Sequence, residues 1–315
     1  MNINVIIAGY KAHASYVFKG IRTQKNINII GVFTGNDDNF CLLGEKPIGE
    51  QAREIGIPVY VPEQLTLETM QSISNKGNRI DLLLLVEWRK LIPESILSFP
   101  VYGTFNIHDS LLPHYRGSSP MNWAIINGLS RSGVTLYRIT KKADSGPIYA
   151  QEEIDIDFID YAIDVLNKVI KVYEKFGMSI VDVIINNPKP MIQDESKATY
   201  CAKRLPQDGL LDFRCDVMTI YNTVRALSYP FPGAFAFYDG IKVTITKASI
   251  VPEKYNYVGC IPGYLLRTEK NWVLCGSGIL CIEEIRAIKN GTEINDPKEL
   301  FLDKSIRLLS RPEKY

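Results

Sequence analysis

Three side chains near the middle of the chain are of types that move protons and stabilise charge. Asn106 and His108 stand two residues apart and directly follow the apolar run 101–105, and Asp144 comes 36 residues after His108. Side chains two apart on a strand share a face, so we expect the amide to lie beside the imidazole. Histidine suits proton transfer near neutral pH, and an amide can hold a developing oxyanion. With Asp144 to orient the imidazole and favour its charged form, the set indicates acyl transfer to an amine.

Each of these residues also has an ordinary structural interpretation. Asn106 could cap a turn, and an isolated histidine is more often structural than catalytic. The run Ser110–Pro113, which breaks the backbone at a proline, and the turn Asp144–Gly146 favour the catalytic interpretation. His13 and His114 have no evident partner in the sequence, which indicates surface histidines at both positions.

The order Asn-x-His-x-Ser-Leu-Leu-Pro from Asn106 to Pro113, followed by an Asp-x-Gly turn at Asp144, resembles the folate-dependent formyltransferase family. Further segments that match its two-domain members are Val5–Gly9, Gly31–Thr34, Pro206–Gly209 and Tyr229–Phe235. The resemblance implies direct transfer from 10-formyltetrahydrofolate. In that reaction Asn106 and protonated His108 would stabilise the tetrahedral oxyanion, and Asp144 would keep His108 poised.

The resemblance also implies where the folate lies. A pterin is flat, with an edge of donors and acceptors, so it suits a slot of exposed backbone groups between apolar walls. Three segments are expected around it, and their residues are Trp88, Lys90, Leu91, Ile92, Ser110, Leu111, Leu112, Pro113, Thr140, Lys141, Lys142 and Ala143. No metal is required, and the six cysteines and three histidines show no ligand spacing.

Composition limits the other classes of protein. The 315 residues hold 36 Lys and Arg against 35 Asp and Glu, so the overall charge calls for neither nucleic acid nor a membrane. Scattered cysteines are typical of reduced thiols in the cytoplasm. Neither a leader pattern nor a run of membrane-spanning length is present in the sequence, and we expect a cytoplasmic protein.

Apolar runs that alternate with helical patterns predict an α/β fold at the start of the chain. Strands are expected at 3–8, 27–33, 58–61 and 81–86, and helices near 13–24, 47–55 and 67–76. This order predicts a Rossmann-like, mostly parallel sheet with helices on both faces, whose ligands bind outside the carboxyl ends of the strands. Gly9 stands without a G-x-G-x-x-G pattern, which excludes a dinucleotide site of that kind.

A second domain is expected after a connector. Residues 1–187 are predicted to form the catalytic domain, with helices at 121–127 and 161–187, and the proline-containing segment 188–206 the linker. In residues 207–315 a short helix near 216–226 precedes strand-like segments at 234–238, 242–246, 272–275 and 279–282. Hairpin signals between these segments predict a small β-barrel, and the resemblance implies an oligonucleotide-binding (OB)-like one.

The acceptor amine is predicted to belong to a nucleotide-linked amino sugar of O-antigen or lipopolysaccharide synthesis. Relatives that formylate methionyl-tRNA carry a basic insertion after the second strand, whereas residues 34–46 here are acidic and lack arginine. A nucleotide sugar needs cations for its diphosphate and an aromatic face for its base. The candidate residues are Arg116, Arg204, Tyr221 and Arg225, with Phe231 as a further aromatic side chain. Ser118 and Ser119 depart from the arginine that the aminoarabinose-formylating relative has after the glycine.

Other functions remain open at this point. One is a methionyl-tRNA formyltransferase, and another is a folate-binding protein without transfer activity or a hydrolase that releases formate. In the preferred interpretation the partners are the folate and a nucleotide sugar, without nucleic acid or membrane. The resemblance alone suggests a homodimer through the barrel domain.

Overall fold

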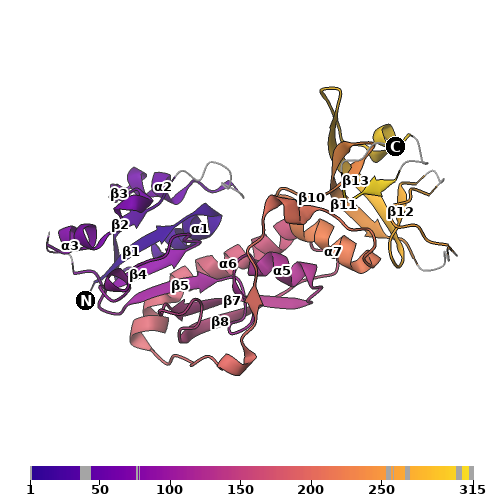
Figure 1. Ribbon diagram of the computed structural model, residues 1–315. Coiled ribbons are helices and arrows are strands. Elements are labelled where there is room, and N and C mark those ends of the chain that lie inside the picture. Colours follow the sequence, from indigo (N-terminus) through magenta and orange to yellow (C-terminus); the bar gives the residue numbers. More distant parts are fainter. Residues whose placement is uncertain are drawn as a thin grey trace. The chain divides into compact units, whose positions relative to one another are not determined.

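The computed structural model describes residues 2–35, 44–75, 77, 79–252, 257, 259–266, 270–302 and 307–311 (Figure 1). Within these ranges the chain divides into two compact units. The first comprises Met1–Pro120, Arg131–Asp155 and Leu166–Ala202, and the second comprises Met121–Ser130, Ile156–Val165 and Lys203–Tyr315. Two short segments from the middle of the chain therefore belong with the C-terminal unit.

A mixed, mostly parallel sheet forms the centre of the first unit. Its strands are β1 (Ile3–Gly9), β2 (Ile27–Phe33), β3 (Val59–Tyr60), β4 (Leu82–Val86), β5 (Thr104–His108), β7 (Arg131–Arg138) and β8 (Ile148–Asp155). Their spatial order is β3-β2-β1-β4-β5-β7-β8, parallel from β3 to β5 and antiparallel from β5 to β8. In Figure 1 β4, β5, β7 and β8 follow one another across this sheet. The mostly parallel α/β fold expected from the sequence is confirmed.

Continuous apolar runs explain the parallel strands. Every residue of β4 is buried, and so are six of the seven residues of β1. Strands that are apolar throughout must be covered on both faces, as in α/β proteins. The helices of this part are α1 (Lys11–Ile21), α2 (Ile48–Glu54), α3 (Leu67–Asn75), α4 (Glu94–Leu97) and α6 (Ala162–Val181), with a π-helical turn at Asp182–Asn186. A two-stranded sheet pairs β6 (Arg116–Gly117) with β9 (Tyr200–Cys201).

Two details differ from the sequence prediction. The strand expected at 101–105 lies at Thr104–His108, because Gly103 turns at φ +97° just before it. Asn106 and His108 both belong to this strand, two residues apart, as the sequence predicted. Strands β7 and β8 were not anticipated, and they bring a further strand alongside β5.

The second unit is an antiparallel half-barrel. Its strands are β10 (Ala234–Tyr238), β11 (Ile241–Ile250), β12 (Trp272–Leu274), β13 (Ile279–Lys289), β14 (Thr292–Ile294) and β15 (Leu308–Leu309), in the order β12-β13-β11-β10-β15 with β14 on β13. Its helices are α5 (Pro120–Ile126), α7 (Val217–Leu227) and α8 (Pro297–Leu300). Buried residues of β10, β11, β13 and α7 share one apolar core.

Candidate active site

Strand β5 carries the two central side chains. Asn106 pairs with Leu85 of β4 on one side and with Tyr137 of β7 on the other. His108 is the last residue of β5 and is buried, with 8% of its surface exposed. Both side chains therefore lie toward the carboxyl end of a parallel strand, where ligands of open α/β sheets bind.

Tyr137 connects Asn106 to Asp144. The Asn106 Nδ2 group donates to the Tyr137 hydroxyl at 3.0 Å, and that hydroxyl donates to Asp144 Oδ1 at 2.6 Å. The backbone N–H of Gly117 donates to the other oxygen, Asp144 Oδ2, at 2.8 Å. Burial, and next the charge of Asp144, raise the pKa of Tyr137 well above its ordinary value. The Tyr137 hydroxyl is thus neutral at physiological pH and donates its proton to Asp144. Its oxygen can then only accept from Asn106, and this hydrogen bond fixes the orientation of the Asn106 amide.

A backbone carbonyl, rather than Asp144, positions His108. The ring atom Nε2 lies 3.0 Å from the carbonyl oxygen of Tyr115. Because a carbonyl only accepts, Nε2 carries the proton, and Nδ1 is the acceptor of the neutral ring. In the part of the chain that the structure describes, no hydrogen bond or ion pair joins His108 to Asp144. The direct carboxylate–imidazole contact expected from the sequence is therefore wrong: Asp144 reaches Asn106 through Tyr137, and the Tyr115 carbonyl holds the imidazole.

The loop after β5 is fastened to β7 and β8. The Thr135 hydroxyl donates to the Ser110 carbonyl at 2.6 Å and accepts from the Leu112 N–H at 3.2 Å. Gln151 Nε2 donates to the Leu112 carbonyl at 2.8 Å and to the Thr135 hydroxyl at 3.0 Å. The Ser110 hydroxyl and the Leu112 side chain are buried, and the Leu112–Pro113 peptide is cis. Of the three segments predicted to hold the folate, the loop 110–113 is consequently held in place by hydrogen bonds to β7 and β8.

The segment after β4 mixes buried and exposed apolar groups. The Trp88 ring lies 5.4 Å from that of Tyr10, and its indole N–H is buried and has no hydrogen-bond partner among the described residues. Ile92 packs against the apolar core of the sheet, whereas Leu91 is fully exposed. Lys90 is paired with Glu63. This segment thus contains an exposed leucine and an unsatisfied indole N–H, both of which are kinds of group that a flat heteroaromatic ligand can contact.

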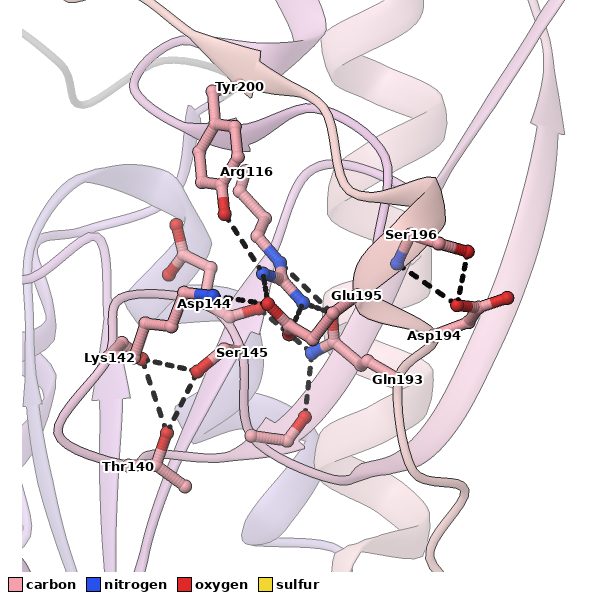
Figure 2. A network of polar contacts seen from close by, with 11 residues as sticks. Arg116, Thr140, Lys142, Asp144, Ser145, Gln193, Asp194, Glu195, Ser196 and Tyr200 are labelled. Atoms are coloured by element: carbon pink, nitrogen blue, oxygen red, sulfur yellow. Dashed lines mark hydrogen bonds and ion pairs between the residues drawn. The ribbon is translucent and has the colours of Figure 1, made fainter.

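The third predicted segment is an exposed turn held by its own polar groups (Figure 2). Thr140 Oγ1 donates to the Lys142 carbonyl at 3.2 Å, and the Ser145 hydroxyl donates to the same carbonyl at 2.8 Å. Lys141 pairs with Glu94 at 2.9 Å, and Lys142 pairs with Glu195. Ala143 is exposed. The turn ends at Asp144, a non-glycine residue held at φ +51°, which brings its carboxylate to Tyr137.

Arg116 has a structural role, which corrects its assignment to the acceptor. Its side chain is fully buried, and Figure 2 shows the guanidinium group surrounded by partners. It donates to Gln193 Oε1 at 2.7 Å, to Glu195 Oε1 at 2.7 Å and to the Tyr200 hydroxyl at 3.3 Å. Gln193 in turn donates to the carbonyl oxygens of Asp144 and Gly146 at 2.8 and 2.7 Å. The predicted phosphate ligand therefore supports the turn that carries Asp144.

The acceptor candidates of the second unit are also engaged by the protein. Arg225 is 2% exposed and donates to Asn222 Oδ1 at 3.0 Å and to the Asp160 carbonyl at 2.8 Å. Tyr221 is buried, and its hydroxyl donates to the Phe158 carbonyl at 3.3 Å. Burial of this kind makes them packing residues rather than surface ligands for a diphosphate.

Arg204 and Phe231 lie in more open surroundings. Arg204 stacks over the Trp123 ring at 4.9 Å and donates to the Asp208 carbonyl at 2.8 Å. Phe231 lines a pocket of about 390 Å³ in the second unit, whose charged lining residues are Asp164, Lys247, Glu284 and Arg286. Two acids oppose two bases there, so the pocket has no excess of positive charge for a phosphate.

Glu195 gives a pH-dependent test of the Arg116 network. Hydrogen bonds from Arg116 and then Lys142 lower the pKa of Glu195 from 4.5 to about 2. A lowered pKa stabilises the fold fully above the ordinary value and loses that contribution as pH falls through the folded value. We expect Glu195→Gln to lower Tm at pH 7, and the difference from wild type to disappear between about pH 4.5 and 2. Glu153→Gln on β8, exposed beside Arg131, is the control and should leave Tm unchanged at every pH. A Tm difference that stays constant with pH would contradict this role.

His13 corrects a second prediction. The sequence indicated a surface histidine, but His13 is only 5% exposed and lies near Glu87 and Asp109. His114 is exposed, as expected. The burial of His13 was not readable from its neighbours in sequence, because its surroundings come from residues 74 to 160 positions away.

Comparison with known proteins identifies the class to which this fold and site belong. Residues 1–184 match the family "Formyl transferase", and residues 204–298 match "Formyl transferase, C-terminal domain". The chain belongs to the formyltransferase family and carries both of the family's domains.

Several solved structures share the fold at low identity. WlaRD, a sugar 3N-formyl transferase solved with dTDP and 5-N-formyl-THF, matches at 22% identity over 93% of this chain and 99% of that one, with TM-score 0.66. Methionyl-tRNA formyltransferase from Clostridium thermocellum matches at 20% identity over 80% of this chain and 95% of that one, with TM-score 0.55. HypX from Aquifex aeolicus, solved with tetrahydrofolic acid, matches at 19% identity over 95% of this chain, with TM-score 0.61. The chain spans about half of HypX, 47% of its length.

Tyr137, which the sequence did not single out, gives a test of the site in terms of formyl transfer. Tyr137→Phe removes the hydroxyl between the Asn106 amide and Asp144, so we expect kcat to fall about tenfold, the value of one hydrogen bond to a charged group. KM for either substrate should change much less. Tyr149→Phe, on the neighbouring strand β8, is the matched control. An unchanged kcat for Tyr137→Phe would mean that the hydroxyl does not position Asn106.

No helix within the described ranges has both the length and the apolar character needed to span a bilayer.

Proposed function

We propose that the chain transfers a formyl group from 10-formyltetrahydrofolate to the amine of a nucleotide-linked amino sugar. The observation that carries the transfer is the arrangement at the end of β5, where Asn106 is hydrogen-bonded through Tyr137 to Asp144 and stands two residues from His108. The folate as donor is supported by the family match and by two structural neighbours that were solved with folates. The residues proposed to catalyse the reaction are Asn106, His108 and Asp144.

In the proposed reaction the amine nitrogen forms a bond to the formyl carbon, and the bond from that carbon to the folate nitrogen breaks. His108 Nδ1 takes the proton that leaves the amine and returns it to the folate nitrogen, so the protons balance. Asn106 Nδ2 has two N–H groups; one donates to Tyr137, and the other is left to donate to the oxyanion. Such a donor contributes about 3 kcal/mol to lowering the barrier. Asp144, acting through Tyr137, holds the Asn106 amide in the orientation that directs its second N–H toward the oxyanion.

The folate-binding role of Trp88, Ile92, Leu91 and the segments at 110–113 and 140–143 is part of the same proposal. Leu91 offers the exposed apolar surface, and the loop 110–113 is held rigid by Thr135 and Gln151. Lys90, Lys141 and Lys142 are ion-paired on the surface, and they can exchange these weak pairs for an anionic tail of the folate.

A sugar acceptor is favoured over tRNA by charge. A tRNA enzyme must hold a polyanion with clustered Lys and Arg, and the net charge of this chain is +1. The acidic sequence of the loop 34–46 also favours a sugar acceptor over tRNA; residues 36–43 of this loop lie outside the described part of the structure. The sugar 3N-formyl transferase WlaRD, solved with dTDP, covers nearly all of this chain. Cytoplasmic location, O-antigen or lipopolysaccharide synthesis and a homodimer stay predictions of the same proposal.

The test is a transfer assay that follows the conversion of 10-formyltetrahydrofolate to tetrahydrofolate. It compares UDP-, dTDP- and GDP-linked amino sugars with the same sugars carrying a hydroxyl in place of the amine. We expect turnover with one amino sugar and none with its hydroxyl counterpart. Formylation of methionyl-tRNA with salt-sensitive tRNA binding would replace this function by the tRNA alternative. Formate release without any amine would indicate a hydrolase.

A further inference from the structure

A second polar cluster lies at the carboxyl edge of the sheet, outside the set used for formyl transfer. It consists of His13 in α1, Glu87 directly after β4 and Asp109 directly after β5. One potential ligand atom from each of these three residues lies within 4.8 Å of the others. One helix and the segments that follow two strands of the sheet thus converge on one point.

His13 is the unusual member of this cluster. Its ring is 5% exposed, and neither Nδ1 nor Nε2 has a hydrogen-bond partner among the described residues. Nε2 lies 3.6 Å from Asp109 Oδ2, which is too long for a hydrogen bond. Two ligands held about 2.1 Å from one ion in a tetrahedral arrangement stand about 3.4 Å apart. The unsatisfied imidazole and this spacing both point to an ion between the two groups.

The neighbouring residues orient the carboxylates as ligands. The Tyr173 hydroxyl donates to Asp109 Oδ1 at 2.5 Å, which leaves Oδ2 facing His13. The Tyr173 ring also meets the His13 ring edge-on at 4.9 Å and limits its rotation. Hydrogen bonds of this kind from outside the ligand set fix metal-binding groups in their ligating orientation.

The third member of the cluster, Glu87, offers a carboxylate oxygen within reach of the other two ligand atoms. Lys11 forms an ion pair with one oxygen of this carboxylate, Oε2, and a carboxylate has a second oxygen to offer.

We propose that His13, Glu87 and Asp109 form a binding site for one divalent transition-metal ion of the zinc type. An imidazole nitrogen among the ligands favours zinc over magnesium and calcium, which take oxygen ligands. Three protein ligands leave a fourth position for water or for a ligand atom. The ion would join helix α1 to the segments after β4 and β5, next to His108 in sequence, and this inference does not depend on which acceptor is formylated.

The test is titration of metal-stripped, full-length protein with Zn²⁺ in a calorimeter, together with Tm measured with and without the ion. We expect one equivalent to bind with micromolar or tighter affinity and to raise Tm, since a ligand of the folded state stabilises it. His13→Gln and Asp109→Asn should each weaken binding by 100-fold or more. His114→Gln, at an exposed histidine on the neighbouring loop, is the control and should bind like wild type.

Among the residues that the structure describes, the exposed thiols of Cys215 and Cys260 are competing zinc ligands. Titration with Co²⁺ separates the two sites, because thiolate ligands add an intense near-ultraviolet band that nitrogen and oxygen ligands lack. We expect visible bands without the thiolate band. A thiolate spectrum, no saturable binding by wild type, or unchanged binding by the His13 and Asp109 variants would each overturn the site. If His13→Gln fails to fold, the affinity of Asp109→Asn and the Co²⁺ spectrum of the wild-type protein still test the site.

Discussion

Replacing Asn106 or His108 by alanine is expected to lower kcat for formyl transfer by about 10²- to 10³-fold. Asn106 supplies the one oriented amide whose direction is fixed by Tyr137, and removing such an oxyanion donor costs about 3–4 kcal/mol. His108 has its tautomer fixed by the Tyr115 carbonyl, so its loss removes the group that carries the proton. The readout is the single-turnover rate at saturating folate and acceptor.

The two variants must be shown to fold. Asn106 is half-buried in the middle of β5, so Asn106→Ala should cost little stability, and far-ultraviolet circular dichroism should match wild type. Asn28→Ala on β2 and His114→Ala are the matched controls for residue type, and both should keep the wild-type rate. Near-normal transfer by Asn106→Ala or His108→Ala would remove this mechanism, whatever the acceptor proves to be.

The double variant separates the two roles. If Asn106 and His108 act on the same tetrahedral species, the losses of kcat in the two single variants will not add. When residues act as a unit, removing one already removes most of the rate enhancement that the set provides. A loss for the double variant close to that of the worse single variant is therefore expected. Fully additive losses would indicate that the two side chains serve different steps.

The sequence predicted the sheet well because burial on both faces leaves a plain signal. Residues 3–8, 27–33 and 81–86 are apolar runs, and they became β1, β2 and β4 nearly as expected. The half-barrel was likewise predicted from alternation and hairpin turns at 234–282. Strands whose hydrophobic pattern depends only on neighbouring residues can therefore be predicted from a single sequence.

The site was only partly accessible because its contacts are long-range. Asn106, His108 and Asp144 were found from type and spacing, but Tyr137 was not, since its place opposite Asn106 depends on the unpredicted strand β7. The alternating apolar positions of residues 131–138 were the available signal for that strand. Arg116 was taken for a ligand because burial of an arginine by partners 77–84 residues away leaves no local trace.

Gly146→Ala is expected to be the most destabilising single methyl addition near the site. A Cβ at Gly146 would lie 1.7 Å from the backbone oxygen of Arg138, the last residue of β7. No side-chain rotation relieves a clash with backbone, so either the end of β7 or the turn that carries Asp144 must move. Overpacking a closed site costs about 1–3 kcal/mol, and a contact this short with backbone puts the expected loss at the upper end or beyond it.

The same substitution should reduce catalysis, because the carbonyls of Asp144 and Gly146 both accept from Gln193, and the turn moves as one piece. We expect Tm to fall by several degrees and kcat by about tenfold, as for the loss of the Tyr137–Asp144 hydrogen bond. Gly35→Ala is the control, since a Cβ there meets nothing closer than 3.4 Å. A Gly146→Ala protein with wild-type Tm and rate would show that the turn is not pressed against β7. Asp144 would then lack the support on which its contact with Tyr137 depends.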